Sequence, residues 1–336
     1  MQAAIYGLAG LSLTSEERAF FLDVDPAGYI LFARNCGDPE QLKSLTASLR
    51  DLHGRADLPI LIDQEGGRVM RMRPPAWPAL PPGAAFERLY QAAPSSAIEA
   101  ARMNARAIGL MLAAHGVNVN CAPMLDVRQP DADRIMGDRA YGTEPMQVSA
   151  IGRAVLDGLA SAGVVGVVKH MPGHGRATVD SHKELPRVAA SAEELEIDLE
   201  PFEALREAPM GMVAHILFEA WDPALPSSQS PFIIDEIIRK RIGFAGLLMS
   251  DDIGMEALTG SAGERSAAAL SAGCDLTLHC SGKFDEMLDV AAHVGEMTSE
   301  AEGRLARAMA GVMLGASEGP DFGEAAAIRD ELLALV

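Results

Sequence analysis

The segment VVGVVKHMPGHG, residues 164–175, passes from an apolar run into a polar, glycine-rich stretch. The run 164–168 is typical of a buried strand. A lysine and two histidines follow it, and Asp180 and His182 come shortly afterwards. Neither a packed helix nor a packed strand needs this mixture of side chains. We therefore interpret the segment as a strand followed by a loop that presents functional groups on an α/β scaffold.

Seven other runs resemble this strand, so eight strands are predicted in all. They cover residues 3–8, 28–34, 59–63, 117–126, 164–168, 211–215, 245–250 and 274–279. Each is followed by a helix or by a loop and a helix, and the runs are continuously apolar rather than alternating. Predicted helices include 38–53, 95–115, 145–162, 191–207, 231–242 and 263–272, with an irregular loop at 74–82.

This order of elements predicts an α/β protein built as one (β/α)8 barrel, with a single domain over residues 1–336. A doubly wound open sheet is the alternative. No G-x-G-x-x-G motif follows the first strand, which weakens the nucleotide-binding form of that alternative.

The composition narrows the class of protein. A chain of 336 residues with 49% hydrophobic and 22% charged residues is typical of a folded domain. Its formal net charge of −19 disfavours nucleic acids and membrane surfaces as partners. No run approaches 18 apolar residues, and the first basic residue, Arg18, comes too late for a signal peptide. Four cysteines without a C-x-x-C pair suggest reduced thiols. We expect a cytoplasmic protein with no obligate protein partner.

Ionisable residues stand at the ends of five predicted strands. These residues are Asp63, Asp126, Lys169 with His170, His215, and Asp251 with Asp252. All strands of a barrel open onto one face at their carboxyl ends, so these groups converge although they are distant in the sequence. Packing does not explain so many buried charges, because each is costly unless paired. The sequence therefore predicts an active site at this face.

Two hydrolytic chemistries fit the residues poorly. His170, His174 and His182 could bind zinc, but their spacing on a loop matches no familiar zinc signature. The chain also lacks the G-x-S-x-G elbow of a serine hydrolase. We expect neither a metal nor a cofactor, and keep a metal-dependent barrel hydrolase as an alternative.

Glycoside hydrolysis fits better. It needs a nucleophile or base on one face of the sugar and a proton donor on the other. Asp251, at a rigid strand end, suits the first role. Asp180 and His182, two residues apart on a loop, suit the second, because an aspartate that orients an imidazole also stabilises its protonated form.

Several motifs in a fixed order make this interpretation specific. They are residues 63–69 (DQEGGRV), 122–127 (APMLDV), 137–141 (GDRAY), 169–175 with 180–182 (KHMPGHG and DSH), and 250–255 (SDDIGM). Together they resemble glycoside hydrolase family 3, and more narrowly its cytoplasmic β-N-acetylglucosaminidases of peptidoglycan recycling. Met171 replaces the usual Phe of the family, and Ala140 a common Ser. Neither change removes a charged group.

The resemblance implies a retaining exo-β-N-acetylglucosaminidase. Its substrate would be N-acetylglucosaminyl-β-1,4-1,6-anhydro-N-acetylmuramic acid, with or without peptide. Asp251 would be the nucleophile, His182 the general acid/base and Asp180 the residue that polarises it.

The resemblance also implies a sugar-binding set, namely Asp63, Arg71, Arg139, Lys169 and His170. We expect His174 to stabilise the loop, Asp126 to orient the arginines, and Arg68 to pair with a carboxylate at the barrel mouth. His215 is either a core histidine or a residue of the pocket wall. Another family 3 β-glycosidase and a non-catalytic sugar-binding protein remain as alternatives.

Overall fold

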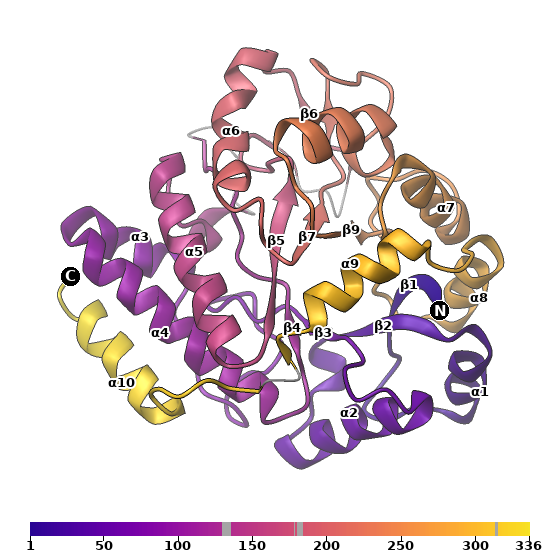
Figure 1. The fold of residues 1–336 in the computed structure, drawn as a ribbon, viewed down its shortest axis with the longest axis horizontal. Helices are drawn as coiled ribbons and strands as arrows, with labels where there is room; N and C mark the ends of the chain where they lie inside the picture. The colour runs from indigo at the N-terminus through magenta and orange to yellow at the C-terminus, as the bar shows by residue number, and fades with distance from the viewer. Residues whose placement is uncertain (130–135, 178, 180–183, 313–314) are drawn as a thin grey trace.

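A closed barrel of eight parallel strands forms the centre of the computed structural model, which describes residues 1–129, 136–177, 179, 184–312 and 315–336. The strands are β1 (Gln2–Gly7), β2 (Pro26–Leu31), β3 (Ile60–Ile62), β4 (Val119–Asn120), β5 (Val165–Met171), β7 (Met210–Val213), β9 (Leu247–Asp252) and β10 (Leu276–His279). Strand β1 pairs with both β2 and β10, so the sheet has no free edge. The predicted (β/α)8 barrel is therefore confirmed, and the open sheet is wrong (Figure 1).

Helices surround the barrel. They are α1 (Ser15–Val24), α2 (Pro39–His53), α3 (Gly83–Ala92), α4 (Pro94–Ala113), α5 (Pro145–Ser161), α6 (Ala192–Ala204), the π-helix η4 (Ile233–Arg241), α7 (Ala262–Ala272), α8 (Phe284–His293), α9 (Ser299–Met309) and α10 (Phe322–Leu333). Several begin at a capping box, in which a hydroxyl and a glutamate three residues later satisfy each other's backbone N–H groups. Thr14 with Glu17 does this for α1, and Ser261 with Glu264 for α7.

Two features of the fold, a small sheet and a helix, were not predicted. A small parallel sheet pairs β6 (Arg187–Val188) with β8 (Leu217–Phe218) outside the barrel. Helix α3 follows the proline-rich loop, and its short buried face was hidden by the preceding prolines. At its first residue, a Cβ on Gly83 would lie 2.1 Å from the carbonyl oxygen of Arg139. The helix therefore packs directly against the 3-10 turn η2 (Gly137–Arg139) at the mouth of the barrel.

Strand β4 is much shorter than predicted because asparagine side chains replace part of its backbone pairing. Asn118 Oδ1 accepts the N–H of Ile60, and Asn120 Oδ1 accepts the N–H of Gln64. After Asn120 the chain continues as a buried apolar loop that still bonds to both neighbouring strands, since Cys121 donates its N–H to Ile62 and Leu125 donates its N–H to Lys169. This loop carries Asp126 toward the same face as the end of β5.

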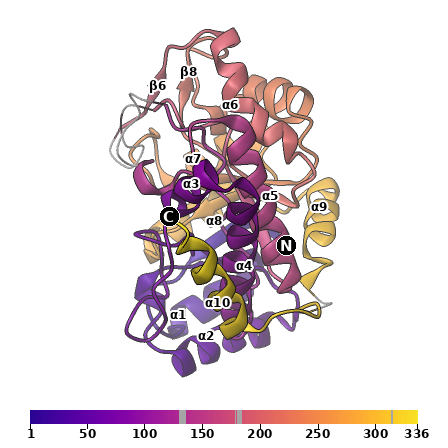
Figure 2. The same ribbon diagram turned by 90° about the vertical axis from the view of Figure 1, so that its left-hand side faces the viewer.

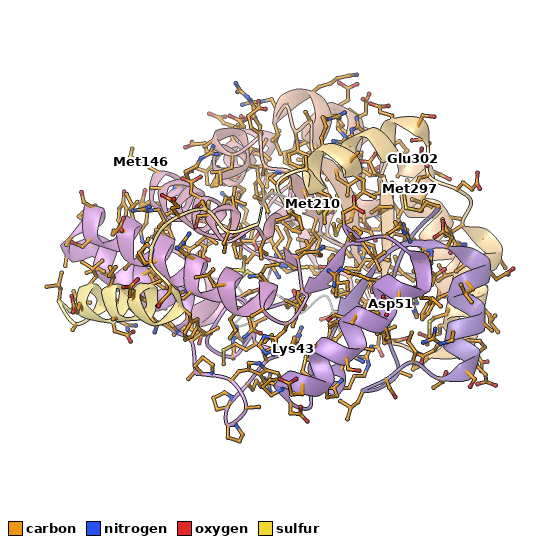
Figure 3. All side chains as sticks on the ribbon, turned by 60° about the horizontal axis from the view of Figure 1, so that its bottom comes forward. Lys43, Asp51, Met146, Met210, Met297 and Glu302 are labelled. Atoms are coloured by element: carbon orange, nitrogen blue, oxygen red, sulfur yellow. The ribbon has the colours of Figure 1, made fainter. Side chains whose placement is uncertain are left out.

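The amino ends of the strands are closed by the chain between α8 and α9. Met297 donates its N–H to the carbonyl of Met1, and Ala3 donates to Gly295. Figure 3 labels Met210 at the start of β7, Met297 in the chain before α9, and Glu302 of α9. Helix α10 lies against α4 in Figures 1 and 2. In the described part of the chain, no helix is both long and apolar enough to cross a membrane.

A buried carboxylate ties this closed end together. Asp275 binds Arg239 at 2.8 Å and Arg304 at 2.7 Å, and it also accepts the N–H of Leu248. Its side chain is only 5% exposed. Arg304 has a second acid partner, Glu300, whose side chain is 72% exposed. The two carboxylates thus share one arginine but differ in burial.

We predict that Asp275→Asn lowers the free energy of unfolding by about 3 kcal/mol or more, because it leaves buried arginine charge uncompensated. Glu300→Gln, the matched control, should cost less than about 1 kcal/mol, since an exposed ion pair contributes little. Urea denaturation followed by fluorescence measures both variants. Equal losses would contradict the assignment of Asp275 as the buried anchor.

Candidate active site

A cavity of about 260 Å³ opens at the carboxyl ends of the strands. Its charged and histidine lining residues are Asp63, Glu65, Arg68, Arg71, Arg139, Lys169, His170, His174, Asp251 and Asp252. All five residues of the expected sugar-binding set thus lie in one cavity with the expected nucleophile. Asp180 and His182, the expected acid/base pair, lie outside the described residues.

Alternation along the chain after β3 gives the cavity two carboxylates. Successive residues of an extended chain point to opposite sides, so Asp63 and Glu65 share a side and Gln64 takes the other. The Gln64 amide accepts the N–H groups of Arg71 and Met72 and donates to the carbonyl of Met72. These bonds hold the segment that contains Arg71 and Met72 against the end of β3. They thereby place the Arg71 guanidinium 2.9 Å from Asp63.

Lys169 joins the two carboxylates. Its Nζ lies 2.9 Å from Asp63 Oδ1 and 2.6 Å from Glu65 Oε1, with a side chain only 3% exposed. Burial raises the pKa of Asp63, but Lys169 and Arg71 outweigh it and lower that pKa to about 2. Burial lowers the pKa of Lys169, and the two carboxylates raise it above its ordinary value. Asp63 and Lys169 are therefore both charged at neutral pH.

Glu65 is the residue of this network that sequence reasoning missed. It accepts two hydrogen bonds from Arg139, at 2.9 Å from Nε and 2.8 Å from Nη2, in addition to the contact with Lys169. Burial raises its pKa, but Arg139 and Lys169 hold that pKa far below the usual range. The signal that could have found it is its spacing of two residues from Asp63.

Among the described residues, Asp126 accepts hydrogen bonds from two histidines and from no arginine, so it supports the histidine loop, as one expectation had it, and is not seen to orient the arginines. Its Oδ2 accepts from His170 Nδ1 at 2.7 Å, and its Oδ1 accepts the N–H of His174 at 2.6 Å. The carboxylate is fully buried. The bond to Nδ1 leaves the other ring nitrogen of His170 available on the cavity side, because a carboxylate only accepts hydrogen bonds. His174 lies in the cavity wall, and burial lowers its pKa to about 4.

Asp251 stands at the end of β9 with one oxygen fixed. Its Oδ1 accepts the N–H of Asp252 at 2.8 Å. Burial raises its pKa, but His170, His215 and Lys169, among other groups, lower the value below the ordinary one. The carboxylate is thus ionised and oriented at neutral pH, as a nucleophile must be.

His215 belongs to the core beneath the site and is absent from the cavity wall. It donates from Nε2 to the carbonyl of Asp252 at 3.0 Å, and its Nδ1 lies 2.6 Å from Ser228 Oγ. Asp252 also accepts the N–H groups of Gly254 and Cys280. These bonds pin the turn that follows Asp251.

Apolar and aromatic surface completes the cavity wall. The guanidinium groups of Arg34 and Arg71 both lie 4.9 Å from the ring centre of Phe32, which lines the cavity.

Arg68 pairs with Asp138 at 2.8 Å, as expected. Met171 is fully buried behind the wall, so the departure from Phe changes core packing and not the cavity lining.

No group of three or more His, Cys, Asp or Glu side chains within the described ranges is arranged to hold a metal ion. His182, which the metal alternative requires, is not among them. What the described residues do supply is the ionised carboxylate of Asp251, in a cavity of fixed hydrogen-bond donors and acceptors.

Comparison with known proteins gives the family. Residues 5–313 match the glycosyl hydrolase family 3 N terminal domain. A beta-hexosaminidase of Aromatoleum aromaticum is 39% identical over 283 residues, 81% of this chain and 77% of that protein. The crystal structure of native NagZ from Neisseria gonorrhoeae is similar with a TM-score of 0.87 and 31% identity, and the match covers 99% of this chain and 98% of that one.

A family 3 beta-N-acetylglucosaminidase from Paenibacillus sp. str. FPU-7 is also similar, with a TM-score of 0.87 and 29% identity. That match covers 98% of this chain and 66% of the other protein. The sequence motifs, the barrel and these relatives agree. The chain belongs to glycoside hydrolase family 3.

Proposed function

We propose that this enzyme is a retaining exo-β-N-acetylglucosaminidase. It removes non-reducing terminal N-acetylglucosamine from β-1,4-linked 1,6-anhydro-N-acetylmuramic acid, with or without peptide, in cell-wall recycling. The observation that carries the proposal is the ionised Asp251 carboxylate, fixed at a strand end inside a cavity of charged hydrogen-bonding groups. The beta-hexosaminidase and beta-N-acetylglucosaminidase relatives support the choice of sugar.

In the proposed mechanism, Asp251 attacks the anomeric carbon as the glycosidic bond breaks. His182, oriented by Asp180, donates a proton to the departing oxygen. The same histidine then takes a proton from water, which attacks the anomeric carbon, releases N-acetylglucosamine and frees Asp251. Two inversions leave the β configuration unchanged.

The cavity suits one terminal sugar. Its volume of about 260 Å³ lies below the roughly 300–1,000 Å³ of sites for drug-sized ligands, which favours a monosaccharide unit and exo action. Asp63 offers acceptors for sugar hydroxyls, while Arg71, Arg139 and Lys169 offer donors. His170 offers the ring nitrogen that Asp126 leaves available.

We also propose that the enzyme works in the cytoplasm on a small muropeptide or disaccharide. Its four cysteines are free, as is typical of proteins in reducing compartments. The net charge of −19 gives nucleic acids and anionic membranes no favourable surface. No obligate protein partner is part of the proposal.

Two alternatives have clear tests. A metal-dependent hydrolase would lose activity on chelation and regain it with zinc. A sugar-binding protein would bind N-acetylglucosamine and hydrolyse no aryl glycoside.

We predict that Asp251→Ala lowers kcat by several orders of magnitude without unfolding the protein, because the covalent step has no other nucleophile. Kinetics on an aryl β-N-acetylglucosaminide and a thermal melt measure this. A 2-fluoro sugar should label Asp251 in the parent enzyme, as read by peptide mass spectrometry. Label on another carboxylate would move the role there.

We predict that His182→Ala slows substrates with poor leaving groups far more than activated aryl glycosides, because only the former need a proton donor. Comparing kcat/KM for the natural disaccharide and a dinitrophenyl glycoside tests this. Equal losses on both substrates would count against His182 as the acid.

We predict a strong preference for a β-N-acetylglucosaminide over the matching β-glucoside, since the acetamido group is part of the proposed recognition. Paired kcat/KM values for the two nitrophenyl glycosides measure it. Preference for the glucoside would assign the chain to another family 3 β-glycosidase activity.

A further inference from the structure

We propose that Glu65 is a positioning residue that fixes the directions in which Arg139 and Lys169 offer their remaining N–H groups to the sugar. The inference rests on the proposed function, because it assigns a role inside the same sugar-binding cavity. It adds Glu65 to the expected sugar-binding set as a residue whose own polar contacts are with Arg139 and Lys169.

Both oxygens of the Glu65 carboxylate are occupied by protein donors. Oε2 accepts from Arg139 Nε at 2.9 Å, and Oε1 accepts from Arg139 Nη2 at 2.8 Å. Lys169 Nζ lies 2.6 Å from Oε1 as well. The Glu65 side chain is only 8% exposed. These three charge-assisted contacts account for most of the capacity of a carboxylate, which has about four lone-pair positions.

The same contacts determine which donors are left for a ligand. An arginine has five N–H donors in a rigid plane, so holding Nε and Nη2 on Glu65 also fixes the direction of Nη1. In the described part of the chain, no protein acceptor is bound to Nη1. Lys169 has three N–H donors, and Asp63 and Glu65 take two of them. Arg139 and Lys169 both line the cavity, where the remaining donors lie.

Two other roles fit Glu65 less well. As a proton donor it would need to be protonated at neutral pH, but its two cationic partners keep it ionised. As a purely stabilising group it would be poorly chosen, because a buried ion pair is often no more stabilising than apolar residues of similar volume. Glu65 instead links the chain after β3 to Arg139 of η2 and to Lys169 of β5, and this place in the cavity wall favours a role in positioning those two side chains.

The backbone at Glu65 is itself tightly constrained. Its N–H donates to the carbonyl of Val69 at 3.0 Å. The next residue, Gly66, has φ +113, and a Cβ there would lie 2.2 Å from the carbonyl oxygen of Pro81. Only glycine fits this turn, so the chain cannot relax easily and carry Glu65 away from its partners.

The experiment compares Glu65→Gln with Asp275→Asn. Both variants neutralise a buried carboxylate that binds two cations, but Asp275 lies at the opposite end of the barrel. We expect Glu65→Gln to weaken N-acetylglucosamine binding and kcat/KM about 30-fold or more, the usual effect of breaking a buried charge pair in a binding site. Asp275→Asn should stay within about twofold of the parent per folded molecule, because distant sites act independently.

A double variant separates positioning from general support. Because Glu65 acts through Arg139 as well as Lys169, Glu65→Gln should cost clearly less kcat/KM in the Arg139→Ala background than in the parent, the remainder being its effect on Lys169, whereas an independent structural defect would add in full. Near-parent kcat/KM in Glu65→Gln, or full additivity, would overturn the proposal. The parent is assayed first on both nitrophenyl glycosides. Absence of β-N-acetylglucosaminide turnover refutes the proposed function alone, and the Glu65 comparison then uses whichever glycoside the parent hydrolyses.

Arg139→Lys keeps the proposal testable should Glu65→Gln fail to fold. Lysine retains the charge but cannot form the two parallel bonds to Glu65. The proposal expects Arg139→Lys to lose as much kcat/KM as Arg139→Ala, since direction and not charge is what Glu65 controls. Near-parent activity of Arg139→Lys would overturn it.

Discussion

The buried ammonium group of Lys169 is the constraint on which the active face depends. A charge with 3% of its side chain exposed is stable only with partners, and its partners come from the chain after β3. Asp63 and Glu65 in turn bring Arg71 and Arg139, which arrive from two different loops. The buried charge of Lys169 is therefore stabilised only when four segments come together at the cavity. They are the end of β5, the end of β3, the loop that carries Arg71, and the turn η2.

The barrel makes this meeting possible at low conformational cost. Parallel strands end at one face, and each is held by neighbours on both sides. Asp251 benefits in the same way, because the N–H of Asp252 fixes one of its oxygens and His215 holds the carbonyl of Asp252. Charged groups so held need little reorganisation when a substrate binds, which is the usual basis of electrostatic catalysis.

The sequence was enough to predict a site residue where an ionisable residue stands at the end of a predicted strand. It placed Lys169, His170, Asp63 and Asp251 at strand ends, and all four line the cavity. The sequence was not enough to predict which side chains bind one another. Asp126 was expected to orient arginines, yet its loop brings it to His170. Helix α3 was missed because its apolar face is short and follows prolines.

By itself, the sequence determined the βα alternation, the barrel class, the family motifs and the residue types available for chemistry. These follow from local periodicity and from contiguous motifs, which need no knowledge of distant neighbours. Only the tertiary structure decided the pairing of the charges: Glu65 with Arg139 and Lys169, Asp126 with His170, and His215 with the turn after Asp251. The physical reason is that a charge buried in the protein is stabilised by whichever opposite charge the fold brings within hydrogen-bond distance, and that distance is unrelated to separation along the chain.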